Sequence, residues 1–208
     1  MYTKAINEKT KSLLAKIRSL RFVSDFYLAG GTSLAIQIGH RQSIDLDFFS
    51  KGSFSVPDIR KELSNLGEYI VVYEDNRTLD IVLDEVKVSF FHYDYDLLYP
   101  LIDFENIKLA DIRDIAAMKI SAISSRGCKK DFIDLFFLLE KYSLEELLSF
   151  FEKKYSKTKY NKMHILKSLV FFDDAEEEPM PVMLKSVDWK NIKKKIIIEV
   201  RNYPEIEK

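Results

Sequence analysis

In the N-terminal half of the chain, some apolar residues alternate as in strands and others recur every three to four residues as in helices. In the C-terminal half, only the helical spacing is found. The N-terminal half predicts strands over 26–30, 43–50, 69–74, 79–84 and 86–93, and helices over 6–20, 32–38 and 57–66. From about Leu109 onward, helices are predicted over 110–125, 130–141, 144–155, 161–170 and 189–202. The acidic, proline-containing stretch 173–181 interrupts them as a loop. This order predicts an α+β protein with an α/β domain over 1–106 and a helical domain over 107–208.

The strand predicted at 43–50 places two aspartates side by side. Its alternation directs Ile44, Leu46 and Phe48 into a core and leaves Asp45 and Asp47 together on the other face, about 6.5 Å apart along the backbone. Two adjacent carboxylates repel each other unless a cation neutralises them. Oxygen ligands at this spacing suit Mg²⁺, with Mn²⁺ as a substitute.

The segment before these aspartates predicts an anion site. Gly30 and Gly31 permit a sharp turn and a close backbone approach, and the helix after them presents free N–H groups. Thr32 or Ser33 is expected to cap that helix and to add a hydroxyl donor. A Gly-Gly turn by itself is common in proteins, and a D-x-D motif by itself usually lies on a solvated surface, so neither alone indicates a functional site. Their combination, on adjacent elements, favours phosphoryl or nucleotidyl transfer.

Composition and charge narrow the function classes. The chain has 208 residues, 47% of them hydrophobic, and a formal net charge of −1, so a polyanion site has to be local. Cys128 is the only cysteine, which excludes an internal disulfide and a Cys-based zinc site, although Lys129 beside it could depress the pKa of its thiol. The sequence shows neither a signal peptide nor an apolar run of about 18 residues. We therefore expect a cytoplasmic protein with no membrane partner.

The stretch GGTSLAIQIGHRQSIDLDFF resembles motif I of the DNA polymerase β-like nucleotidyltransferases. With His40-Arg41 before the aspartates and the segment DIAAMKISAISSRGCKKDFIDLFFLLEKYSLEELL over 114–148, it looks most like the AbiEii branch. That branch comprises nucleotidyltransferase toxins of type IV toxin–antitoxin (abortive infection) systems. The resemblance implies the polymerase β-like core with a mixed sheet, and a helical part that completes the active-site cleft.

The resemblance also implies roles for individual residues. Asp45 and Asp47 would hold the metal, while Gly31 and Thr32 or Ser33, after Gly30, would contact the triphosphate. Lys119 would bind phosphate and Asp131 would complete the site from the helical part. The implied activity is Mg²⁺-dependent transfer of a nucleotide from an NTP to an acceptor such as tRNA or another RNA. A cognate antitoxin would be a partner, and no recognition of a DNA sequence is expected.

One position departs from the superfamily pattern. Many members carry a third catalytic carboxylate on a strand after D-x-D, and the candidate position in VKVSFF is Ser89. Either Asp131 substitutes for it or the site is weakened. Ser89 thus motivates one alternative to the toxin, a nucleotide-binding or partner-binding module that keeps the fold but has lost turnover. A small-molecule nucleotidyltransferase of the antibiotic-modifying kind is a third possibility.

Several basic residues have two interpretations each. Lys119 and Arg126 share a helix face and either reach phosphates or form a solvated face with weak ion pairs. His40 and Arg41 either grip phosphate or cap the preceding helix through its C-terminal dipole. The last helix is either an RNA-backbone surface or an outer face whose Ile192, Ile196 and Val200 pack inward. Its basic residues are Lys190, Lys193, Lys194, Lys195 and Arg201.

Overall fold

The structure is a computed structural model, and it describes residues 1–204. The chain divides into two compact units, Met1–Asp111 and Ile112–Lys208. Each unit has its own buried hydrophobic residues. The division lies five residues after position 106, because a strand at 107–109 still belongs to the sheet of the first unit.

The first unit is built around a seven-stranded mixed sheet in the order β3-β4-β5-β2-β1-β7-β6. Two neighbouring pairs, β2 with β5 and β1 with β7, run parallel, and the other neighbours run antiparallel. The strands are β1 (Tyr27–Leu28), β2 (Leu46–Ser50), β3 (Tyr69–Glu74), β4 (Thr78–Leu83), β5 (Val86–His92), β6 (Ile102–Phe104) and β7 (Ile107–Leu109). The mixed sheet and the α+β class are as predicted.

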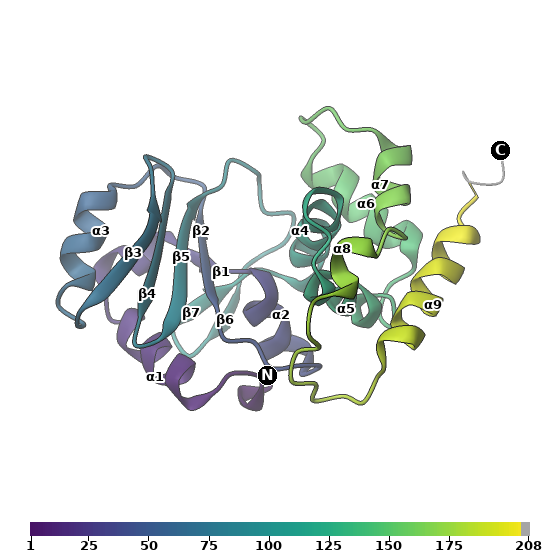
Figure 1. The fold of residues 1–208 in the computed structure, drawn as a ribbon. Coiled ribbons are helices and arrows are strands. Elements are labelled where there is room, and N and C mark those ends of the chain that lie inside the picture. The colour runs from purple at the N-terminus through teal and green to yellow at the C-terminus, as the bar shows by residue number, and fades with distance from the viewer. Residues whose placement is uncertain (205–208) are drawn as a thin grey trace. The chain divides into compact units, whose positions relative to one another are not determined.

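One face of this sheet carries the core of the unit. Helices α1 (Glu8–Ile17) and α3 (Val56–Leu63) cover it, as Figure 1 shows. Every second residue of β4, namely Leu79, Ile81 and Leu83, is fully buried beneath them. Because side chains alternate along a strand, the residues between them point to the opposite face.

The sequence pattern located most of these elements and missed a few. It missed the β6–β7 hairpin and the short 3-10 helices Thr3–Ala5 and Arg21–Asp25, which are too short to display a period. The prediction that Ile44 enters the core is wrong, because β2 begins only at Leu46 and Ile44 is 48% exposed. Leu46 and Phe48 are fully buried, as expected.

The second unit is helical. It contains α4 (Ile112–Ser125), α5 (Lys129–Leu138), α6 (Leu144–Lys154), α7 (Lys162–Ser168), α8 (Asp173–Glu176) and α9 (Trp189–Arg201). The short helix α8 lies inside the stretch predicted as a loop, so that prediction is wrong for residues 173–176. Ile192, Ile196 and Val200 of α9 are buried, which confirms that they pack inward. Among residues 1–204, no helix is both long and apolar enough to cross a membrane.

Candidate active site

The beginning of helix α2 (Gly30–Ile38) lies against the aspartate strand β2. Gly30 has a φ of +65°, in the left-handed region, and a Cβ built on it would stand 2.6 Å from Oδ2 of Asp47. Any side chain at this position would therefore collide with the Asp47 carboxylate and strain the backbone. The local structure brings the positive end of α2 and the carboxylate of Asp47 together.

The second glycine makes room for a cation. A Cβ at Gly31 would overlap Nη2 of Arg41, whose side chain is among the largest that are fully buried. The Arg41 guanidinium thus lies at the first turn of α2, so the alternative in which it caps the C-terminal end of that helix is wrong. Gly39, in the left-handed conformation, is the residue at that end.

The hydroxyls of Thr32 and Ser33 are engaged inside the protein. Thr32 Oγ1 donates its hydrogen bond to the main-chain oxygen of Asp45 and lies 2.9 Å from Ser43 Oγ, to which it is also hydrogen-bonded. Ser33 Oγ accepts from Gln37 Nε2 at 3.1 Å. Neither residue is the N-cap of α2; that position is held by Ala29, which makes no side-chain capping bond. The capping prediction is therefore wrong, and the hydroxyl of Thr32 instead ties α2 to the segment before β2.

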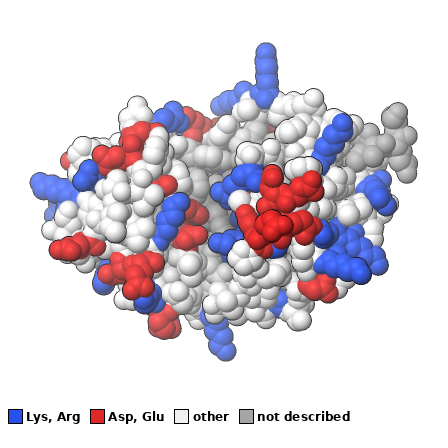
Figure 2. Space-filling model, viewed as in Figure 1, with Lys and Arg blue, Asp and Glu red and all other residues white. Residues whose placement is uncertain are grey.

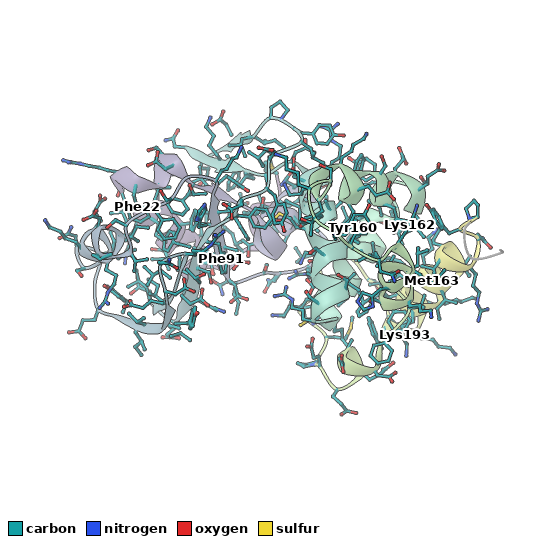
Figure 3. All side chains as sticks on the ribbon, turned by 90° about the horizontal axis from the view of Figure 1, so that it is seen from above. Phe22, Phe91, Tyr160, Lys162, Met163 and Lys193 are labelled. Carbon is teal, nitrogen blue, oxygen red and sulfur yellow. The ribbon has the colours of Figure 1, made fainter. Side chains whose placement is uncertain are left out.

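Asp47 and Ser89 are neighbours in the sheet. The parallel register of β2 and β5 pairs them directly, so their side chains leave the same face. Ser89 is fully buried, and its Oγ has no hydrogen-bond partner among the described residues. Phe91, labelled in Figure 3, follows two residues further along β5 and pairs with Phe49 of β2. Ser89 is thus a buried polar residue beside the carboxylate strand partner Asp47, with an aromatic side chain two residues further along β5.

The residues around Asp47 offer the chemistry that a hard divalent cation needs. Asp45 and Asp47 are partly exposed, and their donors are oxygen atoms, as Mg²⁺ and Mn²⁺ prefer. Among residues 1–204, however, no three His, Cys, Asp or Glu side chains are grouped so as to hold a metal by themselves. The donor set fits a cation that completes its coordination with water and substrate oxygens.

The second unit contains a buried ion-pair cluster at the contact of α4 and α5. Lys119 Nζ lies 2.8 Å from Oδ1 of Asp131 and 2.6 Å from Oδ2 of Asp134. The Lys119 side chain is 6% exposed, Asp131 1% and Asp134 not at all. The interpretation of Lys119 as part of a solvated face is therefore wrong. Asp134, one helical turn after Asp131, has the structural role expected from that spacing, because its ion pair with Lys119 ties α5 to α4.

Arg126 extends this cluster toward solvent. Its Nε lies 2.9 Å from Asp131 Oδ2, while 62% of its side chain remains exposed. Burial by itself raises the pKa of the Asp131 carboxyl, but the Lys119 ammonium and the Arg126 guanidinium outweigh it, so this pKa lies below its usual range. Asp131 is held as a carboxylate with cations on both sides.

The thiol of Cys128 does not have the low pKa that was expected. Burial, followed by the negative charges of Asp131 and Glu178, raises the pKa of the Cys128 thiol, so the expected depression of that pKa is wrong.

The basic residues of α9 lie beside acidic ones. Figure 2 shows an acidic patch over α8 beside a basic patch over α9. Lys193, labelled in Figure 3, pairs with Glu176, and Lys195 pairs with Glu199 of its own helix.

The fold identifies the class of protein: solved structures that share its architecture show that the chain has a nucleotidyltransferase fold. A crystal structure from H. pylori, provisionally described as a nucleotidyltransferase, has a TM-score of 0.59 at 15% identity and covers 97% of this chain and 95% of its own. The nucleotidyltransferase toxin MenT4 from Mycobacterium tuberculosis H37Rv has a TM-score of 0.57 at 16% identity and covers 96% of this chain and 86% of its own.

Sequence comparison identifies the family. Residues 12–207 match the model described as nucleotidyl transferase AbiEii toxin of the type IV toxin–antitoxin system. An uncharacterised protein of Aquifex aeolicus (strain VF5) is 41% identical over an alignment of 185 positions, which covers 83% of this chain and 86% of that protein. The chain belongs to the AbiEii family of nucleotidyltransferase toxins, and the resemblance carried by the Gly-Gly and D-x-D motifs is confirmed.

Proposed function

We propose that this toxin transfers a nucleotide from an NTP to an RNA acceptor, with tRNA as the first acceptor to test, in a reaction that depends on Mg²⁺. The observation that carries the proposal is the contact between Gly30 and Asp47. It brings a helix N-terminus, which attracts phosphate, to a carboxylate that suits a divalent cation. Recognition of a triphosphate needs phosphate-binding N–H groups and a bound divalent cation at the same place.

The residues of the first unit would hold the reacting phosphates. Asp45 and Asp47 would bind the cation, which, when bound, would neutralise charge on the phosphate oxygens. The main chain at Gly30 and Gly31 and the buried Arg41 guanidinium would face the triphosphate. Thr32 and Ser33 would contribute through the α2 backbone, since their hydroxyls are already engaged within the protein.

The second unit would contribute Lys119, Arg126 and Asp131. The exposed guanidinium of Arg126 can contact a phosphate while Nε still binds Asp131. Lys119 is shared between two carboxylates, so its first effect is to keep Asp131 ionised and oriented. An ionised Asp131 would in turn orient the Arg126 guanidinium.

In the proposed reaction, an acceptor hydroxyl oxygen bonds to the α-phosphorus of the NTP. The bond between the α-phosphorus and the bridging oxygen breaks, pyrophosphate leaves, and the hydroxyl proton is released. The main chain at the start of α2 and Arg41 would stabilise the charge that develops on the phosphates. Placement of the two reactants and this electrostatic stabilisation supply most of the rate in such transfers.

Label position tests the reaction directly. Purified protein would be incubated with Mg²⁺, total RNA and each of the four NTPs, labelled either at the α- or at the γ-phosphate. Nucleotidyl transfer puts the α label into RNA and leaves the γ label in pyrophosphate. Transfer of the γ label to RNA would instead indicate a kinase and would contradict the proposal, as would the absence of transfer from every NTP by folded protein.

A matched pair of variants links the activity to the site. Asp47→Asn should reduce α-label transfer by at least about 100-fold, because an amide cannot replace a carboxylate metal ligand. Asp103→Asn, at an exposed aspartate of β6 that pairs with Lys108, removes the same charge elsewhere in the sheet and should transfer as the wild type does. Equal losses in both variants would contradict the assignment of Asp47.

The toxin would also have a partner. Membership of a type IV toxin–antitoxin family implies a cognate antitoxin, and we expect its coexpression to relieve the growth arrest that the toxin causes. Growth curves of cells that carry the toxin gene with and without the neighbouring gene would test this. Persistent arrest with both proteins present would exclude that neighbour as the antitoxin.

A further inference from the structure

A second carboxylate lies on the same row of the sheet as Asp47. The antiparallel register of β4 and β5 pairs Asp80 with Ser89, and the parallel register of β2 and β5 pairs Ser89 with Asp47. Paired residues in adjacent strands place their side chains on the same face. Asp80, Ser89 and Asp47 therefore form one line across three strands, which we call the polar row.

Two oxygen atoms of the polar row lack hydrogen-bond partners among the described residues. These are Oγ of Ser89, which is fully buried, and Oδ1 of Asp80. The other carboxylate oxygen of Asp80, Oδ2, lies 3.6 Å from Lys87 Nζ, and the Asp80 side chain is 16% exposed. A buried polar atom without a partner costs free energy, so the presence of two in one row indicates that something polar occupies the row in the working protein.

The spacing of the strands limits what that occupant can be. Adjacent strands are about 4.8 Å apart, so the Cα atoms of Asp47 and Asp80 are about 10 Å apart. Mg²⁺ binds its ligands at about 2.1 Å and keeps several waters. Two carboxylates on alternate strands are thus poorly placed to share the inner ligand sphere of one cation. They can instead be joined through a water molecule that the cation holds.

We infer that Asp80 and Ser89 bind the water shell of the divalent cation held at Asp45 and Asp47. Asp80 Oδ1 accepts a hydrogen bond from a metal-bound water, and Ser89 Oγ bonds to the same shell from between the two carboxylates. Asp80 thereby supplies, through water and from the next strand, negative charge that Ser89 lacks. This inference rests on the proposed function, because it takes the cation at Asp45 and Asp47 as its starting point.

Binding of Mn²⁺ to the full chain tests the inference without reference to turnover. The free Mn²⁺ signal in electron paramagnetic resonance measures the dissociation constant for wild type, Asp80→Asn and Ser89→Ala. Residues that hydrogen-bond to metal ligands typically contribute 10–100-fold to metal affinity. We expect Asp80→Asn to weaken Mn²⁺ binding by at least about 10-fold, and Ser89→Ala to weaken it in the same direction.

Two controls separate this role from simpler effects. Asp103→Asn removes a carboxylate that pairs with a lysine of the neighbouring strand in the same sheet, and it should leave the dissociation constant unchanged. Ser89→Ala carries no change of charge, so weaker binding in this variant cannot arise from long-range electrostatics. Circular dichroism of both polar-row variants would establish that they are folded.

The outcomes distinguish this inference from the function on which it rests. If Asp47→Asn abolishes Mn²⁺ binding while Asp80→Asn and Ser89→Ala bind within twofold of wild type, the polar row has no role and the proposed metal site stands. If the wild type itself binds no Mn²⁺ in the presence or absence of an NTP, both the inference and the metal-dependent function are overturned.

Discussion

At the scale of single residues, the two glycines at the start of α2 each have a specific neighbour. Gly30 leaves space for the carboxylate of Asp47, and Gly31 leaves space for the guanidinium of Arg41. One glycine therefore accommodates a negative group and the next a positive one. The pair does more than permit a sharp turn, because it sets the distance between a helix end and two charged side chains.

We predict that Gly30→Ala reduces both stability and activity. A non-glycine residue at a φ of +65° costs about 1–2 kcal/mol, and its Cβ would displace Asp47. Urea denaturation should show this loss, and α-label transfer should fall with it. Gly52→Ala is the matched control, because its Cβ would meet only Ser50 Oγ at 3.7 Å. Normal transfer by Gly30→Ala would show that the position of Asp47 is unimportant.

The ionisation of Asp131 leads to a prediction about pH. Because the pKa of this carboxyl is lower in the folded protein than in the unfolded chain, its contribution to stability is complete above about pH 4 and is lost as the pH falls through the folded pKa. Asp131→Asn should lower the free energy of unfolding by about 3 kcal/mol at pH 7, and by less at pH 3.

Urea titrations of both proteins at several pH values would measure this difference. Asp103→Asn, at an exposed ion pair, should change stability by no more than about 1 kcal/mol at either pH. A difference between wild type and Asp131→Asn that stays constant from pH 7 to pH 3 would contradict the coupling of Asp131 to its two cations.

At the scale of elements, periodicity predicted the long helices and the sheet but not how polar residues join them. The strand 69–74 was predicted with its observed bounds, because alternation and flanking turn residues agree there. Lys119 and Asp131 could be proposed from a family resemblance alone. Their burial with Asp134 depends on how α4 packs against α5, which no local pattern encodes. The same holds for the polar row, since strand order and register are long-range properties.

A buried ion pair between α4 and α6 illustrates this limit. Lys154 Nζ lies 2.7 Å from Asp114 Oδ1, and neither side chain is exposed. We predict that Asp114→Asn and Lys154→Met each lower the free energy of unfolding by about 3–5 kcal/mol, because each leaves a buried charge without this partner. The double variant should lose much less than the sum of the two.

A double-mutant cycle by urea denaturation would give the coupling energy, which we expect to be about 2 kcal/mol or more. The partly exposed pair of Lys162 and Glu152, at 3.1 Å between α7 and α6, is the comparison and should couple by about 1 kcal/mol or less. Additive losses at Asp114 and Lys154 would contradict a specific pairing between these helices.

At the scale of the whole molecule, the candidate residues are distributed over two compact units. Asp45, Asp47 and Arg41 belong to the first, and Lys119 and Asp131 to the second. The sequence pattern could indicate an α/β part followed by a helical part, because strands cease to recur after about Leu109. The hairpin β6–β7 is the exception, since three-residue strands carry too little periodicity to be seen.

We predict that toxicity in cells requires both units. Induced expression of the wild type should arrest growth, whereas Asp47→Asn in the first unit and Asp131→Asn in the second should each allow growth at equal protein levels. Immunoblots would establish those levels, and Asp103→Asn should remain toxic. Arrest by the Asp47→Asn variant at wild-type levels would mean that toxicity does not depend on nucleotide transfer.

The buried hydroxyl of Ser89 has a consequence for evolution and engineering. A hydroxyl without a hydrogen-bond partner destabilises the folded state by about 1–3 kcal/mol, so Ser89→Ala, which replaces the hydroxyl with a hydrogen atom, should raise the melting temperature of the metal-free protein. Selection for heat resistance alone would therefore favour alanine at this position. If the polar row binds the water shell of the cation, such selection would produce a toxin that is more stable but less active. Stability and activity conflict at the hydroxyl oxygen of Ser89.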